Sequence, residues 1–185
     1  MPTPSANVTT LSYTHGASSV PLLGETIGEN LRRTVARFGD HEALVVRQQG
    51  YRASYRQLWD QTALVARGLL ARGVRKGDRV GIWSPNRFEW VMVQYATARM
   101  GAILVNINPA YKSAELEYSL NQSGVSVLLL AERFRQTDYL EILEEVRGRC
   151  AELREALVLD RDWDDLVGAS SQVPEKDLEE IELAL

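Results

Sequence analysis

The chain has 185 residues, which is close to one domain on the usual prior of roughly 150 residues per domain. Hydrophobic residues make up 45% and charged residues 25% of it, which excludes a disordered or membrane-embedded composition. The net charge is −4, from 21 basic and 25 acidic residues, and the basic residues are spread along the chain. No broad phosphate-neutralising surface is therefore expected, and nucleic acid is not an expected partner.

No transmembrane segment is predicted, because the longest apolar run, residues 125–131, is far shorter than the roughly 20 residues of a spanning helix. The single cysteine, Cys150, excludes an internal disulfide, and two histidines are too few for the common Cys/His zinc sites. No lysine or arginine precedes Arg32, so neither a secretory nor a mitochondrial leader is predicted. The expected compartment is the cytoplasm.

The chain begins with an expected arm and a first helix. Residues 1–24 are rich in Pro, Ser, Thr and Gly and lack apolar periodicity, so we expect them to be extended. Thr26 and Glu29 then form a capping box. Apolar residues recur at helical spacing from there to Gly39, which predicts an amphipathic helix.

A hairpin and a second helix are predicted next. A β-branched run at residues 43–46 and a second run at residues 48–53, with a turn at Gly50, indicate a short hairpin or bent strand pair. Ser54 and Gln57 form another capping box and open a helix.

Short apolar runs then alternate regularly with capped helices. The expected strands are residues 79–83, 102–107, 125–130 and 156–159, and the expected helices are residues 88–100, 114–123 and 138–149. Asn86 is predicted to cap the first of these helices, with Glu89 at its third position. The strands are continuous Val/Ile/Leu runs, which are typical of a sheet covered on both faces. We predict an α/β fold with a doubly wound, mostly parallel sheet and helices on both faces, plus the arm and the short hairpin.

After Asp160 this alternation stops. Residues 175–185 hold five acids against one lysine, with a short helix predicted at residues 178–185. That helix ends on an apolar stripe without a partner element, which we interpret as a chain that continues. The expected division is an arm at residues 1–24, an α/β subdomain at residues 25–160, and an acidic linker or helix at residues 161–185.

Nucleophilic residues are not grouped for catalysis. His15 lies in the arm and His41 in a helix-to-strand turn, so both are expected to be ordinary surface histidines. Cys150 is expected to be an inert buried thiol. The first helix carries three arginines, Arg32, Arg33 and Arg37. They either contact an acidic partner or, as we favour, form the solvated face of this helix.

Candidate binding loops follow from the fold. No G-x-G-x-x-G or G-x-x-x-x-G-K-[ST] motif is present, so the familiar phosphate cradles are missing. Ligands of doubly wound sheets bind at the carboxyl ends of the strands, which here are followed by residues 84–86, 108–111 and 131–133. Asn108 and Tyr111 either line a pocket there or, as we favour, form an Asn-Pro turn and a packing contact.

Several stretches resemble, in order and spacing, the front of an AMP-forming acyl-CoA synthetase of the acyl-adenylate-forming superfamily, in its fatty-acyl or medium-chain form. They are TIGENLRRTVARFGDHEAL at residues 26–44, SYRQL at 54–58, KGDRVGIWSPN at 76–86 followed by FEW at 88–90, GAILVNINPAY at 101–111 and ELEYSLNQSG at 115–124. Together they are distributed over residues 26–124.

The resemblance implies a ligase that activates a fatty carboxylate with ATP to acyl-AMP and transfers the acyl group to coenzyme A. ATP, magnesium and coenzyme A are implied for the full-length enzyme. The family's P-K-G phosphate loop, adenine-binding segment, ribose-binding aspartate and C-terminal lysine have no counterparts here. We therefore assign no catalytic, cofactor-binding or metal-binding residues, and we expect an inactive N-terminal scaffold that is an incomplete part of a larger enzyme.

The alternative function is a stand-alone, non-catalytic binding or interaction module of the same α/β fold. We also expect self-association to a homodimer, because apolar surface that other domains normally cover promotes it.

Overall fold

The structure is a computed structural model that describes Gly16, residues 19–20 and residues 22–185. Most of the arm predicted for residues 1–24, including His15, lies outside the described residues. The central element is a four-stranded sheet made of β3 (Arg79–Trp83), β4 (Ile103–Ile107), β5 (Val125–Leu130) and β8 (Glu155–Val158). All its neighbours are parallel, in the order β4-β3-β5-β8, which confirms the predicted sheet.

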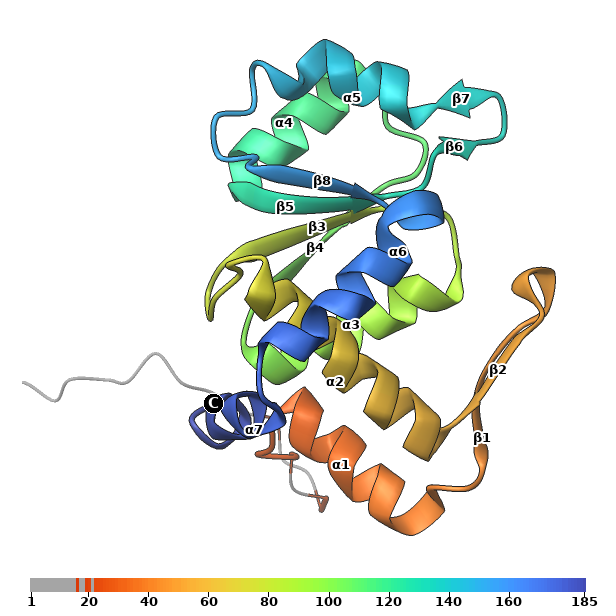
Figure 1. Ribbon diagram of the computed structural model, residues 1–185, viewed down its shortest axis with the longest axis vertical. Helices are drawn as coiled ribbons and strands as arrows, with labels where there is room; N and C mark the ends of the chain where they lie inside the picture. The colour runs from red at the N-terminus through yellow and green to blue at the C-terminus, as the bar shows by residue number, and fades with distance from the viewer. Residues whose placement is uncertain (1–15, 17–18, 21) are drawn as a thin grey trace, which may run out of the picture.

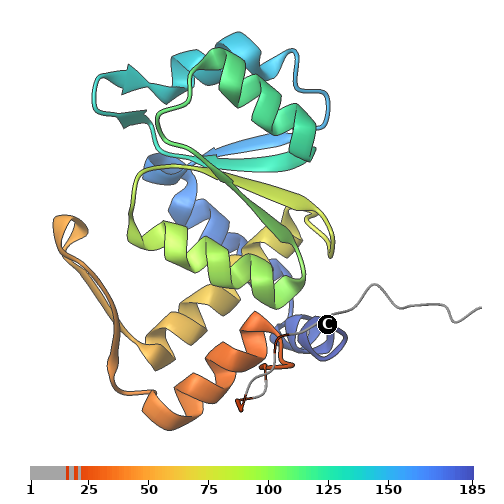
Figure 2. The same cartoon turned by 180° about the vertical axis from the view of Figure 1, so that it is seen from behind.

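Helices cover both faces of this sheet, as the continuous apolar strands predicted. One face carries α2 (Tyr55–Ala71), α3 (Phe88–Met100) and α6 (Leu159–Gly168). The other carries α4 (Ser113–Ser123) and α5 (Tyr139–Arg147) (Figures 1 and 2). The predicted doubly wound α/β fold is confirmed.

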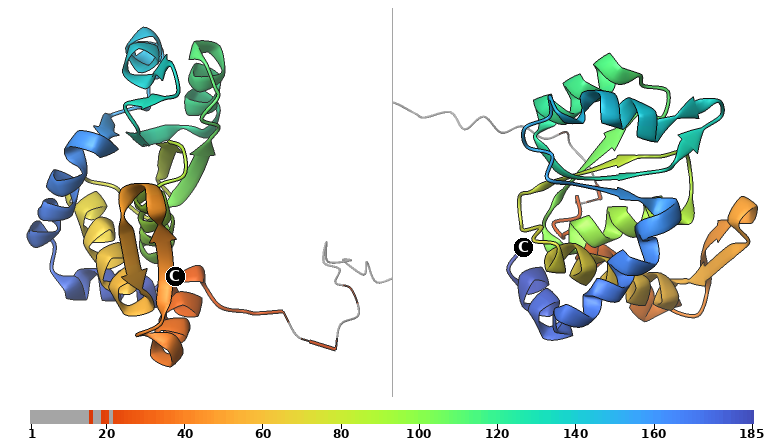
Figure 3. Two further views of the ribbon diagram at one scale, coloured as in Figure 1. Left: turned by 90° about the vertical axis from the view of Figure 1, so that its right-hand side faces the viewer. Right: turned by 45° about the horizontal axis from the view of Figure 1, so that its top comes forward.

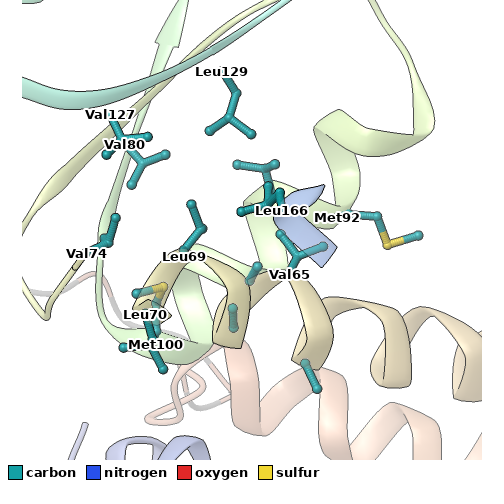
Figure 4. Packing of buried hydrophobic residues seen from close by; sticks show 14 of the residues in the cluster. Val65, Leu69, Leu70, Val74, Val80, Met92, Met100, Val127, Leu129 and Leu166 are labelled. Atoms are coloured by element: carbon teal, nitrogen blue, oxygen red, sulfur yellow. The ribbon is translucent and has the colours of Figure 1, made fainter. Parts of the chain in front are cut away.

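Two hydrophobic cores result, one on each face of the sheet. Val80 and Ile82 of β3 belong to the first core. Figure 4 shows Val80 in this core together with Leu69 of α2 and Leu166 of α6. Trp83, at the end of the same strand, belongs to the second core. Full burial of one such side chain, relative to leaving it exposed to water, stabilises the folded protein by about 1.5–3 kcal/mol.

The first two helices begin at the predicted capping boxes. The Thr26 hydroxyl accepts from the amide of Glu29 at 3.1 Å, and the Glu29 carboxylate accepts from the amide of Thr26 at 2.9 Å. This box opens α1 (Ile27–Phe38). Ser54 and Gln57 exchange the same two bonds at the start of α2, so local sequence sets both helix starts.

The predicted hairpin is also present. β1 (Glu42–Val46) pairs antiparallel with β2 (Tyr51–Ser54), joined by η1 (Arg47–Gln49). Gly50 follows η1 with a φ of 63°, the left-handed conformation that favours glycine. The hairpin extends away from the four-stranded sheet (Figure 1).

The alternation of strands and helices ends after β8, as predicted, but the segment that follows holds more helix than the single short one expected at residues 178–185. It forms α6, η2 (Ala169–Gln172) and α7 (Glu175–Leu183), which starts three residues before the predicted helix. The many acidic residues of α6 made its apolar side hard to recognise in the sequence, although that side packs Leu166 into the first core. Contacts with α2, which lies far away in sequence, therefore decide this helix.

One local prediction is wrong, and one small hairpin was not predicted. The N-cap of α3 is Arg87 rather than Asn86, and its side chain makes no capping bond. Glu89 instead accepts hydrogen bonds from the side chains of Arg87 and Gln49. The structure also has a small hairpin, β6 (Arg133–Phe134) with β7 (Thr137–Asp138), that the periodicity did not indicate.

Within the described ranges, no helix is long and apolar enough to span a bilayer.

Close packing of α2 on α6 leads to a stability prediction. A Cβ atom at Gly68 would lie 2.1 Å from the backbone carbonyl oxygen of Leu166, so Gly68→Ala must push α6 away. We expect a loss of about 1–3 kcal/mol, although alanine favours helix more than glycine does. Urea unfolding measures it. The matched control is Gly148→Ala, where a Cβ meets nothing within 4 Å and a change within about 0.5 kcal/mol is expected. Equal stability of both variants would contradict the packing.

Candidate functional site

The carboxyl ends of the four strands lie in one row. Trp83 of β3 pairs with Ile107 on one side and with Leu130 on the other, and Leu130 pairs with Val158. The loops that follow these strands therefore share one edge of the sheet, as expected for residues 84–86, 108–111 and 131–133. The chain passes from β3 to β4 on one side and then to β5 on the other, so this edge contains the topological switch point where such sheets bind ligands.

Backbone contacts close the switch point between β3 and β5. The amide of Ala131 donates to the carbonyl of Trp83 at 3.2 Å, which extends the strand pairing by one residue. Ser84 is buried, and its hydroxyl donates to the carbonyl of Pro85 at 2.9 Å. The Ser84 hydroxyl is therefore satisfied within its own loop.

Asn108 forms a turn. Its side-chain oxygen accepts from the amide of Ala110 at 2.9 Å, and its carbonyl accepts from the amide of Tyr111 at 3.0 Å. The Tyr111 side chain is half-buried against the second core. These contacts support the turn and packing interpretation over the pocket interpretation.

An aromatic stack holds this turn against the sheet. The rings of Trp83 and Tyr139 stack with centroids 3.7 Å apart. The Trp83 indole donates to the carbonyl of Asn108 at 3.1 Å, and the Tyr139 hydroxyl donates to the carbonyl of Pro109 at 2.6 Å. Burial raises the pKa of Tyr139 to about 12, so its hydroxyl stays a donor at neutral pH.

A polar network that the sequence did not indicate lies beside this edge. Arg87 binds the buried carboxylate of Glu89 with two nitrogens, at 2.7 and 2.9 Å, and its third nitrogen reaches Asp160 at 3.0 Å. Gln49 of the hairpin donates to Glu89 at 2.9 Å and accepts from the amide of Phe88 at 2.8 Å. The network thus ties the hairpin, α3 and the start of α6 together.

Charge pairing continues along the edge. Asp160 also accepts from the amide of Glu132, whose carboxylate pairs with Arg161. Arg133 pairs with Asp138 across the β6–β7 hairpin at 3.4 Å. Each of these charged groups therefore already has a partner of opposite sign.

The pKa of Arg87 reflects the same network. Burial by itself lowers this pKa, but the hydrogen bonds and charges of Glu89 and Asp160 outweigh burial and raise it above its ordinary value. The network is therefore stabilised in its charged form. Glu89 and Asp160 lie far apart in sequence, so only the folded chain brings them to one arginine.

These residues do not fit the phosphates of ATP or a magnesium ion. The cations named along the edge are occupied by carboxylates, and no glycine-rich loop presents amides there. Across the part of the chain that the structure describes, no cluster of three or more His, Cys, Asp or Glu could hold a metal ion. The arrangement can hold this edge of the sheet rigid.

The remaining candidates have structural positions. His41 is exposed near Phe38, with ring centroids 5.6 Å apart. Cys150 is buried. Arg32, Arg33 and Arg37 are exposed on α1, and Arg33 pairs with Glu25.

Sequence comparison assigns the family. Residues 31–182 match the family of AMP-binding enzymes, so the chain belongs to that family. It is 44% identical over 146 residues to the mitochondrial medium-chain acyl-CoA ligase ACSF2 of Mus musculus, covering 79% of this chain and 23% of that protein. It is 38% identical over 135 residues to the putative acyl-CoA synthetase YngI of Bacillus subtilis, covering 73% of this chain and 24% of that protein.

Solved structures agree with this assignment. The long-chain-fatty-acid-CoA ligase FadD1 of Archaeoglobus fulgidus superposes with a TM-score of 0.74 at 26% identity, covering 90% of this chain and 33% of that one. The N-terminal domain of FACL13 from Mycobacterium tuberculosis gives 0.70 at 25% identity, covering 77% and 36%. The chain spans about a quarter of the length of the curated relatives it matches, and it corresponds to an N-terminal portion of an acyl-CoA synthetase.

The network predicts an asymmetry between two arginines. Arg87→Ala leaves the buried carboxylate of Glu89 without its bidentate partner, and we expect a loss of about 3 kcal/mol in unfolding free energy. Arg161→Ala removes an exposed pair and should cost less than about 1 kcal/mol. Chemical denaturation of both variants measures this difference. Similar small losses would show that the Arg87 network is not structurally important.

Cys150 should react slowly in the native protein. Burial first, and then the charge of Glu117, raise the pKa of the thiol, so the thiolate fraction at pH 7.5 falls and access is blocked. We expect disulfide-exchange labelling at least about tenfold slower than in urea. The control, Gln122→Cys, adds a thiol at an exposed position that should label rapidly in the same chain. Fast native labelling of Cys150 would contradict the inert assignment.

Proposed function

We propose that the chain is the N-terminal part of an ATP-dependent acyl-CoA synthetase. The parent enzyme activates a fatty carboxylate to acyl-AMP and passes the acyl group to coenzyme A. The supporting observation is the 44% identity with a medium-chain acyl-CoA ligase over 79% of this chain, which extends across only 23% of that protein. The fatty acid is the proposed substrate of the parent enzyme.

In this proposal the described residues act as scaffold. The aromatic stack at Trp83 and the Arg87 network fix the loops at the carboxyl edge of the sheet. Catalysis of adenylate formation needs donors aimed at the transferred phosphates, and the paired charges of this edge offer none. ATP, magnesium and coenzyme A are therefore assigned to the remainder of the parent enzyme, and the 185-residue chain alone is inactive and binds none of them.

Domain division and compartment are parts of the same proposal. The chain divides into an arm at residues 1–24, an α/β subdomain at residues 25–160 and an acidic segment at residues 161–185 that leads to the remainder. The acidic segment also packs onto the subdomain through Leu166 and Leu178. We propose a cytoplasmic location, whereas the name of the mouse relative specifies mitochondria.

The 185-residue chain and the product of the longer coding sequence should differ in activity. The 185-residue chain should give no carboxylate-dependent exchange of pyrophosphate into ATP, because it lacks a phosphate cradle. The product of the longer coding sequence should exchange pyrophosphate with at least one member of a fatty carboxylate series. The assay includes a no-carboxylate control for each protein.

Three outcomes would contradict the proposal. Exchange by the short chain would refute its scaffold role. Failure of the folded longer protein with every carboxylate would refute the ligase. A stop codon directly after Leu185 would favour the alternative, a stand-alone binding module.

A further inference from the structure

Asp160 lies where the chain leaves the last strand of the sheet. It is the second residue of α6, which begins directly after β8. The start of α6 and the β6–β7 hairpin both lie at the end of the sheet to which the strand arrows point (Figures 1 and 3). This is the carboxyl edge, where the loops after β3 and β5 form the topological switch point. Asp160 therefore lies beside both loops although it belongs to neither.

One carboxylate bonds to both of these loops. The Asp160 carboxylate accepts from the Arg87 guanidinium at 3.0 and 3.1 Å, and Arg87 ends the loop after β3. It also accepts from the backbone amide of Glu132 at 3.2 Å, and Glu132 belongs to the loop after β5. We call these two contacts the Asp160 bridge. Through this bridge, the ends of β3, β5 and β8 are joined at one side chain.

Further bonds hold the two groups that Asp160 contacts. The buried carboxylate of Glu89 accepts from Arg87 at 2.7 and 2.9 Å, so the guanidinium is held on its other side. The Glu132 carboxylate pairs with Arg161, which is the residue after Asp160. Because both partners are held in this way, a change at Asp160 alters the distance between the two loops.

The bridge needs a group that accepts hydrogen bonds at both of its oxygens. Oδ1 lies 3.0 Å from Arg87, whereas Oδ2 lies 3.1 Å from Arg87 and 3.2 Å from the Glu132 amide. Asparagine has the same shape but only one acceptor oxygen. In either orientation its NH₂ group would face a donor, namely Arg87 alone or Arg87 together with the Glu132 amide. Asp160→Asn therefore breaks the bridge while it preserves the size of the side chain.

We propose that Asp160 is a positioning residue for acyl activation in the parent enzyme, which fixes the spacing of the loops at the switch point. Ligands of doubly wound sheets bind in the crevice between such loops. A shift of about 1 Å in a positioned group costs on the order of a hundredfold in rate. Asp160 acts through the two loops and not by contact with substrate. This inference rests on the proposed ligase function and extends it to one residue of the carboxyl edge.

Asp78 offers a matched control at the opposite edge of the sheet. It directly precedes β3, and its carboxylate accepts from the backbone amide of Arg75 at 2.9 Å and pairs with Arg154 at 3.9 Å. The exposed fractions of the two aspartate side chains are also similar, 35% for Asp78 and 42% for Asp160. Both aspartates thus contact one arginine and one backbone amide, but only Asp160 lies at the edge with the switch point.

Hydrogen exchange in the 185-residue chain tests the bridge itself. In Asp160→Asn the amide of Glu132 loses its acceptor, so its exchange should become at least about tenfold faster. Asp78→Asn should leave the exchange of this amide within about twofold of the wild type. NMR-detected exchange measures the amide, and urea unfolding compares the stability of the two variants. Equal exchange of the Glu132 amide in both variants would refute the bridge.

Kinetics of the product of the longer coding sequence test the positioning role. Asp160→Asn should raise the KM for ATP or for the fatty carboxylate at least about tenfold in pyrophosphate exchange. Asp78→Asn should change neither KM by more than about twofold. A variant that is merely less stable contains less active protein, which lowers the apparent kcat and leaves both KM values unchanged. The KM therefore separates positioning from stability.

Two kinetic results would overturn the role of Asp160. One is unchanged KM values in Asp160→Asn, whatever happens to kcat, and the other is an equal response of the Asp160 and Asp78 variants. Absence of pyrophosphate exchange by the wild-type longer protein would refute the ligase, and the role in acyl activation with it. Because the Glu132 amide is measured in the 185-residue chain, failure of the bridge is distinguished from failure of the proposed function.

Discussion

The structure depends on one strand, β3, that is buried on both faces and paired on both edges. Val80 and Ile82 fill the core under α2, α3 and α6, whereas Trp83 fills the core under α4 and α5. β4 and β5 pair with β3 on its two sides, so it carries the hydrogen bonds of both halves of the sheet. A strand in this position requires apolar residues in both directions, and RVGIW provides them.

The position of β3 determines the chemistry available at the sheet edge. Trp83 ends the strand and fixes the Asn108 turn through its indole and its stack on Tyr139. Arg87 follows a few residues later and joins Glu89 to Asp160. The polar groups in this region are therefore already paired within the chain. This pairing supports the proposed scaffold role of the region rather than a role in binding a ligand.

The sequence by itself determined the elements whose signals are local. The capping boxes at Thr26 and Ser54 and the continuous apolar strands predicted helix starts and a covered parallel sheet, because each signal lies within a few residues. Only the tertiary structure decided the roles of Glu89, Asp160 and α6. Glu89 pairs with Arg87, which is only 2 residues away, but Gln49 lies 40 residues from Glu89 and Asp160 lies 73 residues from Arg87, so the complete network exists only in the folded chain. An acidic stretch became a helix because α2 offered a surface to its buried side.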